Sequence, residues 1–185
     1  MIAQQRSKAL KARRALDDNA RDIAASRINE QFIRSHEFSA AKTIACYLPM
    51  DDEVDPSRII KRAWCAKKRV FCPVIEKNGT MTFRQLDRDT TLHRNNFGLW
   101  EPVDGITIAS NSLDVVVTPL VAFDTNNNRI GMGGGFFDRS FAFLRHKKRW
   151  LRPKLIGLAF ACQEVENIET NPWDIRLYSV ITDAN

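Results

Sequence analysis

Hydrophobic and polar positions follow a helical period in the first third of the chain. Residues 2–16 combine helix-forming residues with many cations and predict one helix. A second, amphipathic helix is expected after Asp17 and Asp18, which offer an N-cap. Its apolar stripe recurs at helical spacing and comprises Ile23, Ala24, Ile28 and Phe32. A third helix is expected to start at Asp55-Pro56 and to bury Ile59, Ile60, Ala63 and Trp64.

Short apolar runs between and after these helices predict strands. They cover residues 43–48, 70–75, 81–86, 113–122, 154–160 and 178–182. Asn78-Gly79 supplies the turn of a hairpin, and 113–122 (LDVVVTPLVA) is the most apolar stretch, which favours a central strand. Residues 87–112 are expected to be mainly loop, and a last helix is predicted over residues 135–147.

Strands that alternate with helices predict an α/β domain with a largely parallel sheet and helices on both faces. In such sheets, ligands bind at the carboxyl ends of the strands. We therefore expect the turns after Leu48, Ala122 and Phe160 to form the working edge. The chain length of 185 residues, with 44% hydrophobic residues, suits one domain spanning residues 1–185.

Charge and cysteine usage narrow the class of protein. The net charge is +6 and the pI is about 9.4, a balance that favours anionic partners. The four cysteines form no C-x-x-C pair, which is typical of a reduced cytoplasmic protein. No apolar run approaches the ~20 residues of a membrane span. The basic N-terminus lacks the apolar core of a secretory signal.

The strongest chemical signal is the segment RIGMGGGFFDR, residues 129–139. Its four glycines follow a predicted strand and precede a predicted helix, so that backbone N–H groups and the helix N-terminus can approach a phosphate. It is neither a P-loop, because no Gly-Lys-Ser/Thr end is present, nor a G-x-G-x-x-G fingerprint. Asp138 could hold a magnesium ion, and Arg129 is a cation at the start of the glycine-rich segment. The structural alternative is a tight turn whose Asp stabilises the helix dipole.

Three other places carry candidate chemistry. Glu53 lies in the acidic run of residues 49–55, which could also be a solvated loop before a helix. The basic stretch in residues 6–14 could steer phosphates, although an exposed helix face is the simpler interpretation. Asp174 could be a second magnesium ligand, although a turn residue after Pro172 is simpler.

Several motifs together resemble those of the 5-formyltetrahydrofolate cyclo-ligase family, also called 5,10-methenyltetrahydrofolate synthetase. They are PLVAFD (119–124), RIGMGGGFFDR (129–139), EVD (53–55), NFGLWEP (96–102), Trp173-Asp174 and VIT (180–182). The resemblance implies a Rossmann-like three-layer α/β domain. It also implies an ATP- and Mg²⁺-dependent ligase of folate and one-carbon metabolism. Such a ligase converts 5-formyltetrahydrofolate to 5,10-methenyltetrahydrofolate, with ADP and phosphate released, through a phosphorylated formyl intermediate.

The resemblance also implies roles for individual residues. Arg129 and Asp138 would be catalytic, and Asp138 and Asp174 would hold Mg²⁺. The folate would contact Glu53, Phe97 and Phe136. ATP would contact Arg6, Arg129, Ile130, Gly131, Met132, Gly133, Gly134, Gly135, Phe136 and Phe137. The expected partners are the two small-molecule substrates alone, with no nucleic acid and no membrane, and the protein is expected to be a monomer.

Some positions depart from the family pattern and motivate other hypotheses. Ile2 stands where members usually carry a Lys, and Phe136-Phe137 replaces the usual Tyr-Tyr. Met132 and Gly134 occupy positions where some members place cations. These departures leave a non-catalytic folate- or nucleotide-binding relative as the alternative. The high pI suggests a nucleic-acid-binding protein as a third possibility, but no recognised nucleic-acid-binding module is present.

Overall fold

A computed structural model describes residues 1–50, 52–146 and 152–184, and in these ranges the main sheet has seven strands in the order β11-β10-β7-β1-β2-β3-β6. All pairs from β11 to β2 are parallel, whereas β2-β3-β6 is antiparallel. The strands are β1 Thr43–Ala45, β2 Arg69–Ile75, β3 Met81–Gln85, β6 Thr107–Ile108, β7 Val115–Thr118, β10 Lys154–Leu158 and β11 Ser179–Ile181. The expected largely parallel sheet is therefore confirmed.

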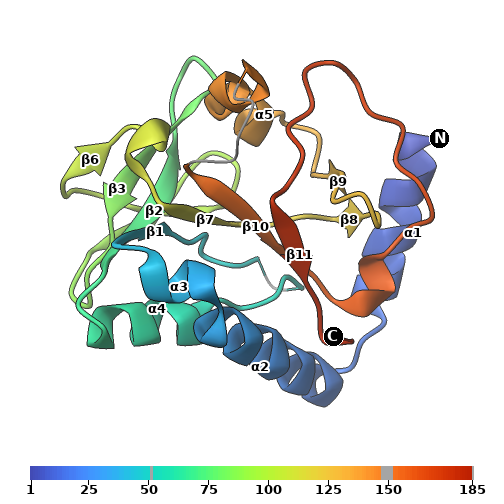
Figure 1. The fold of residues 1–185 in the computed structure, drawn as a ribbon, viewed down its shortest axis with the longest axis horizontal. Helices are drawn as coiled ribbons and strands as arrows, with labels where there is room; N and C mark the ends of the chain where they lie inside the picture. The colour runs from blue at the N-terminus through green and yellow to red at the C-terminus, as the bar shows by residue number, and fades with distance from the viewer. Residues whose placement is uncertain (51, 147–151, 185) are drawn as a thin grey trace.

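Helices cover both faces of this sheet (Figure 1). Below it lie α2 Asp18–Arg34, α3 His36–Ala40 and α4 Ser57–Cys65. Above it lie α5 Phe136–Ser140 and the 3-10 helix η2 Ala142–His146. A further 3-10 turn, η1, spans Ser110–Ser112. The arrangement is the three-layer α/β fold expected from the sequence.

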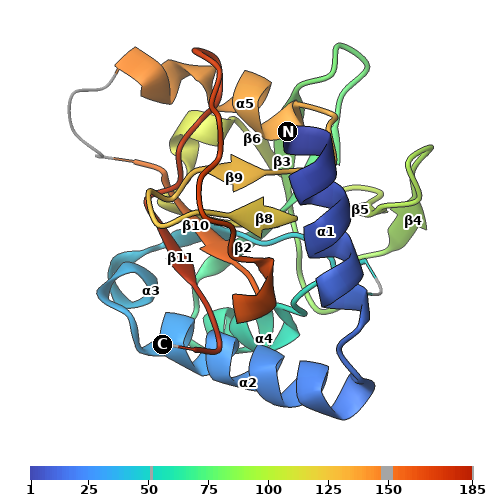
Figure 2. The ribbon, with the colours of Figure 1, turned by 90° about the vertical axis from the view of Figure 1, so that its right-hand side faces the viewer.

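Two small hairpins and the first helix complete the structure. One hairpin joins β4 Leu92–Arg94 to β5 Trp100–Pro102, and the other joins β8 Ala122–Phe123 to β9 Arg129–Ile130. Helix α1 Ile2–Arg14 runs beside β8 and the 3-10 helix η3 Ala161–Gln163 (Figure 2). The first helix therefore lies next to the hairpin that leads into the glycine-rich segment.

The core lies on both faces of the sheet, and β7 shows how the sequence divides between them. Val115 and Val117 pack in the cluster under α2 and α4, whereas Val116 packs in the opposite cluster with Phe141. This is the alternation that a strand requires. Because both faces are covered, the strand is an unbroken apolar run, as is typical of parallel sheets.

Local sequence signals place most elements correctly. The Asp17 carboxylate accepts a hydrogen bond from the Ala20 amide at 2.8 Å, which confirms the predicted N-cap of α2. Strands β2 and β3 form the predicted hairpin. Ile23 was expected in the buried stripe of α2, but it is 47% exposed, so that expectation is wrong. The other three residues of the expected stripe, Ala24, Ile28 and Phe32, are buried in the core as predicted.

Three expected segments differ from the structure. The strand expected over 113–122 breaks at Pro119, which has no N–H for a sheet ladder, and becomes β7 and β8. Residues 87–112, expected to be mainly loop, also contain the short strands β4, β5 and β6. The helix expected over 135–147 ends at Ser140 and continues only as η2, while residue 147 lies outside the described residues.

Gly157 on β10 is expected to tolerate no larger residue. A Cβ at this position would lie 2.6 Å from Leu120 Cδ2 and 2.8 Å from Leu177 Cδ1, and both leucines are buried. Gly157→Ala should therefore lower the free energy of unfolding by about 2 kcal/mol through overpacking. Urea denaturation measures this change, and an unaltered unfolding midpoint would contradict it.

Candidate functional site

The glycine-rich loop, residues 131–135, joins β9 to α5 and lies against α1. Arg6 of α1 donates a hydrogen bond from Nε to the Gly131 carbonyl at 2.9 Å, across 125 residues of sequence. Gly133 and Gly135 have φ values of 102° and 65°, which only glycine adopts without strain. Within the described part of the chain, no backbone N–H of this loop donates a hydrogen bond. The structure therefore brings together Arg6 and the glycine loop, both of which the resemblance implies for ATP contact.

Arg129 and Asp138 form an ion pair directly behind this loop. Arg129 Nη2 lies 2.8 Å from Asp138 Oδ1, and the two side chains are 7% and 20% exposed. The same carboxylate oxygen accepts the Ile175 amide at 3.0 Å, while the guanidinium lies 5.5 Å from the centre of the Phe137 ring. Burial lowers the pKa of Arg129 against the opposing effect of Asp138 and Asp174. Arg129 is thus paired with Asp138 and also lies in the electrostatic field of Asp174.

The Nη1 nitrogen of Arg129 lies near the glycine loop rather than near Asp138. Nη1 makes no hydrogen bond to a described residue, and a Cβ on Gly131 would lie 3.7 Å from it. Nη1 is therefore the part of Arg129 that faces the glycine loop, whereas Nη2 holds Asp138.

The residues expected to hold magnesium fit such an ion. In the described residues, Asp138 Oδ2 and Asp174 Oδ1 accept no hydrogen bond, while Oδ2 of Asp174 accepts the Asn171 amide at 2.7 Å. No cluster of three or more metal-binding side chains occurs in the described ranges. Mg²⁺ typically binds one or two carboxylates and completes its shell with water and substrate phosphates. Asp138 and Asp174 supply carboxylate donors of the type in that pattern.

Aromatic side chains border the other side of the glycine loop. The rings of Phe97 and Phe136 meet edge to face with their centres 5.4 Å apart, and Phe97 is 60% exposed. Arg139 lies over the Phe136 ring at 5.3 Å and donates to the carbonyls of Gly79 and Gly134, both at 2.7 Å. The two phenylalanines that the motifs predicted for the folate therefore come together. The sequence analysis missed Arg139, which fastens the loop to the β2–β3 turn.

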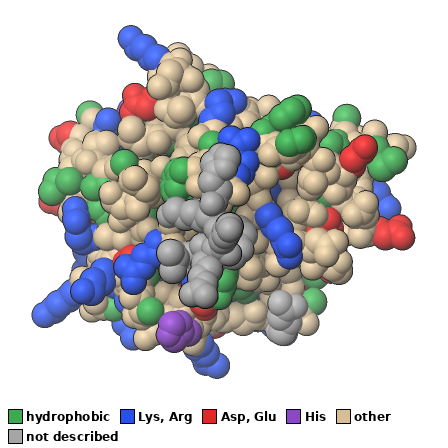
Figure 3. All heavy atoms as spheres, turned by 45° about the horizontal axis from the view of Figure 1, so that its top comes forward, with side chains coloured by type: hydrophobic (Ala, Val, Ile, Leu, Met, Phe, Trp, Pro, Cys, Tyr) green, Lys and Arg blue, Asp and Glu red, His purple; other side chains and the backbone are tan. Residues whose placement is uncertain are grey.

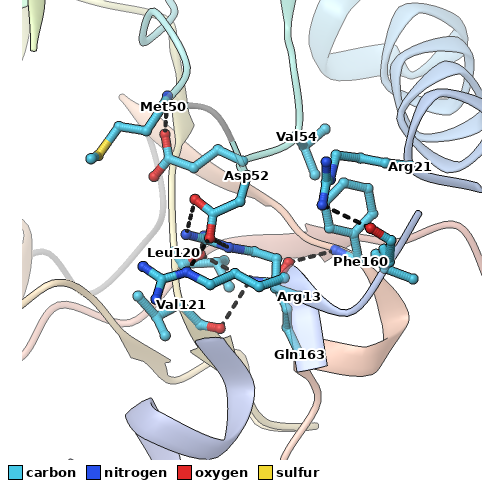
Figure 4. A network of polar contacts seen from close by, with 12 residues as sticks. Arg13, Arg21, Met50, Asp52, Val54, Leu120, Val121, Phe160 and Gln163 are labelled. Carbon is cyan, nitrogen blue, oxygen red and sulfur yellow. Dashed lines mark hydrogen bonds and ion pairs between the residues drawn. The ribbon is translucent and has the colours of Figure 1, made fainter. Parts of the chain in front are cut away.

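The acidic segment after β1 lies at the carboxyl edge of the sheet, as expected. Asp52 binds Arg13 through two contacts, Nη2–Oδ1 at 2.9 Å and Nε–Oδ2 at 3.2 Å (Figure 4). Glu53 accepts the Met50 amide at 3.0 Å, and burial raises the pKa of its carboxyl. Glu53 is half-buried, so the alternative of a fully solvated acidic loop does not hold for this residue.

Arg13 on α1 is buried, which differs from the exposed position expected from the sequence. The basic face of α1 was expected to be exposed, which holds for Lys8, Lys11 and Arg14. The side chain of Arg13, however, is only 3% exposed. Its spacing could have revealed this, because position 13 shares a helix face with the buried Ala9, four residues earlier.

The Arg13–Asp52 pair makes stability depend on pH. Burial opposes ionisation of Asp52, but Arg13 and Arg14 outweigh it and lower the pKa of this carboxyl. The pair therefore stabilises the folded protein above the unfolded pKa of about 3.9, and this contribution is lost as the pH falls through the folded pKa. In urea titrations, the stability difference between wild type and Asp52→Asn should shrink on acidification below about pH 4. A difference that stays constant with pH would contradict this.

The surface above the site is mixed in character. Seen from the side of α5, Lys and Arg side chains are spread over the face, with hydrophobic side chains exposed between them (Figure 3). Exposed apolar side chains of the described residues include Met50, Phe97, Trp100, Met132 and Trp173. None of the described helices has the length and apolar character that crossing a bilayer requires.

The fold and these residues define a three-layer α/β protein whose glycine loop, arginine–carboxylate pair and aromatic pair lie together. The chain is an enzyme of the 5-formyltetrahydrofolate cyclo-ligase family, whose model matches residues 3–183. The family expected from the motifs is thereby confirmed.

Several known proteins are similar to this chain in sequence or in structure. A 5-formyltetrahydrofolate cyclo-ligase of Haemophilus influenzae is 38% identical over 164 residues, covering 82% of this chain and 84% of the relative. One from Escherichia coli is 36% identical over 148 residues, covering 78% and 79%. The 5,10-methenyltetrahydrofolate synthetase of Aquifex aeolicus superposes with a TM-score of 0.83 at 26% identity, covering 100% of this chain and 90% of that one. The enzyme of that name from Mycoplasma pneumoniae has the same fold, with a TM-score of 0.76 at 24% identity and 98% of both chains covered.

Proposed function

We propose that this protein converts 5-formyltetrahydrofolate to 5,10-methenyltetrahydrofolate in a reaction that consumes ATP and requires Mg²⁺. The names of its relatives support the folate substrate. The observation that carries the nucleotide part is the glycine loop, whose amides donate no hydrogen bond within the described residues and which lies between Arg6 and Arg129. Such a backbone surface between two cations suits a triphosphate.

The proposed chemistry uses phosphate to activate a poor electrophile. The formyl oxygen attacks the γ-phosphorus of ATP, and ADP leaves as the P–O bond to the β-phosphate breaks. The product is a phosphorylated imidate. The second nitrogen of the folate then attacks the formyl carbon and releases its proton to solvent, the C–O bond breaks, and phosphate departs. Phosphoryl transfer of this kind needs positioning and charge neutralisation more than a protein nucleophile.

The residues of the loop would supply that positioning. Backbone N–H groups of 131–135, the Arg6 guanidinium and Nη1 of Arg129 would bind the phosphates. A magnesium ion, when bound, would neutralise phosphate charge, and Asp138 and Asp174 would hold it. Because α5 has only five residues, its dipole contributes little, so we assign the positive potential mainly to the arginines.

The folate would lie on the aromatic side of the loop. The exposed ring of Phe97 and its neighbour Phe136 offer apolar faces for the folate rings. Glu53 would hydrogen-bond the polar edge of the pterin.

Phe97→Ala should affect the folate selectively. Because Phe97 is 60% exposed, the substitution should leave stability nearly unchanged. Loss of its ring should raise the KM for 5-formyltetrahydrofolate about 10-fold, with little change in the KM for ATP. Steady-state kinetics measure both, and Ile106→Ala, at a similarly exposed position (59%), is the control. Equal increases in the two KM values would contradict a folate role.

A direct assay tests the proposed function. Purified protein is mixed with ATP, Mg²⁺ and 5-formyltetrahydrofolate, and the methenyl chromophore is followed by absorbance. Its appearance, with one ADP formed per product, is the expected result. Folded protein that binds both ligands without forming chromophore would refute the proposal and favour a non-catalytic binding relative. The monomeric state and the cytoplasmic location expected from the sequence remain predictions.

A further inference from the structure

Arg13 connects three segments that are far apart in the sequence. Its guanidinium binds Asp52 through two contacts and donates from Nη1 to the Leu120 carbonyl at 3.3 Å. Gln163 donates to the same Leu120 carbonyl at 3.0 Å and to the Val121 carbonyl at 2.8 Å. Figure 4 shows Arg13 between Asp52 and these carbonyls. The buried Arg13 side chain thus fastens α1 to the segments that follow β1 and β7, and Gln163 joins the segment after β10 to the same Leu120 carbonyl.

Arg6 and Arg13 lie on the same face of α1. They are seven residues apart, which is about two helical turns and about 10 Å along the axis. Between them, the buried Ala9 packs against Val121 and Ile130 of the β8–β9 region. The helix therefore acts as a short rigid bar with Arg6 over the glycine loop at one end and Arg13 on the acidic segment at the other.

The acidic segment after β1, which includes Asp52 and Glu53, carries the residue proposed to bind the folate. Asp52 is adjacent in sequence to Glu53, whose own carboxylate folds back onto the Met50 amide. Because Asp52 is held by Arg13 on one side and by Arg14 at 3.1 Å on the other, a movement of α1 must move this segment with it. Two-contact arginine–carboxylate pairs fix direction as well as distance, which a single contact does not.

We propose that Arg13 and Asp52 are positioning residues that couple nucleotide binding at Arg6 to folate binding at Glu53. The inference rests on the proposed function, since it assigns the two substrates to these two ends. Nucleotide bound at Arg6 and the glycine loop fixes α1, and the Arg13–Asp52 pair then fixes the acidic segment in the orientation that receives the folate. By linkage, folate must tighten nucleotide binding by the same factor. Neither Arg13 nor Asp52 needs to touch a substrate.

The test measures that coupling factor without turnover. Binding of the β,γ-imido analogue of ATP, with Mg²⁺, is measured by calorimetry with and without saturating 5-formyltetrahydrofolate, and the reverse titration checks reciprocity. In the wild type, each ligand should tighten the other about 5-fold or more. Asp52→Asn replaces one acceptor oxygen with an amide and should reduce the factor to below about 2-fold. Each ligand alone should bind the variant with nearly unchanged affinity.

Two further variants separate coupling from stability. Arg13→Lys keeps the charge but loses the two-contact geometry, and it should lose the coupling as well; it carries the test if Asp52→Asn does not fold. Asp18→Asn is the matched control, because it neutralises the 98% exposed partner of a surface ion pair on α2, and its coupling should equal that of the wild type.

The outcomes distinguish the inference from the proposed function. A wild type that binds neither ligand would refute the proposed function. A wild type that binds both ligands independently would overturn the coupling alone. Retention of the full factor in the folded Arg13→Lys and Asp52→Asn variants would also overturn the coupling, and the pair would then be purely structural.

Discussion

Asp138→Asn is expected to reduce turnover at least about 100-fold while the protein stays folded. The amide keeps an oxygen that can accept from Arg129 and from the Ile175 amide, so the local hydrogen bonds persist. It removes the negative charge, however, and with it the proposed support for magnesium. The chromophore assay at saturating ATP measures the loss, and circular dichroism measures the fold.

The matched control for this substitution is again Asp18→Asn, an exposed carboxylate on another helix. Its turnover should equal that of the wild type. A shift of the Asp138→Asn rate toward higher Mg²⁺ concentrations would support the metal role further. Turnover within about 3-fold of the wild type would exclude both the metal role and the catalytic role of this carboxylate.

Arg129→Met is expected to lower the free energy of unfolding by about 3 kcal/mol. The Arg129 side chain is 7% exposed and is the counterion of Asp138, which is itself only 20% exposed. Removal of the cation leaves a partly buried carboxylate without compensation, and the contact with the Phe137 ring loses its charge. Urea denaturation followed by fluorescence measures the change.

A double variant identifies the cause of that loss. If the uncompensated carboxylate is responsible, adding Asp138→Asn to Arg129→Met should regain at least about 1 kcal/mol. A loss in the single variant below about 1 kcal/mol, or a double variant that is less stable still, would contradict this explanation of the ion pair.

The sequence predicted the elements whose signals are local. The cap at Asp17 and the hairpin turn at Asn78-Gly79 act over a few residues, and both are present. The helix expected over 135–147 fails because its end is set by distant partners. Ser140 Oγ accepts the Met81 amide, and the Ser140 carbonyl accepts the Ser110 hydroxyl. The pattern of residues within 135–147 cannot reveal these contacts, because the partners lie elsewhere in the chain.

The same distinction applies to the site. The glycine loop and Asp138 stand in one motif, so the sequence reveals them together. The family resemblance implied only that Arg6 and the glycine loop share a ligand. Neither the contact of Arg6 with Gly131 nor the Arg13–Asp52 pair, 39 residues apart, was expected. The sequence shows that α1 carries many cations. Which of these side chains are buried depends on how the helix packs against the sheet, and the sequence alone does not show this.

The structure also changes the source of the positive charge. The motif suggested a helix N-terminus as the phosphate site, but α5 is a single short turn of five residues. Three arginines approach the loop instead: Arg6 and Arg139 bind its carbonyls, and Arg129 lies beside Gly131. Point charges held by hydrogen bonds therefore replace the dipole in the proposed recognition of phosphate.

The most direct test is a crystal structure of the protein soaked with Mg²⁺ and the β,γ-imido analogue of ATP. We predict that its triphosphate lies against loop 131–135, within hydrogen-bond distance of the loop amides and Arg6, with the metal on Asp138. A nucleotide bound at another place, with the amides of the loop closed into a turn of their own, would contradict the proposal.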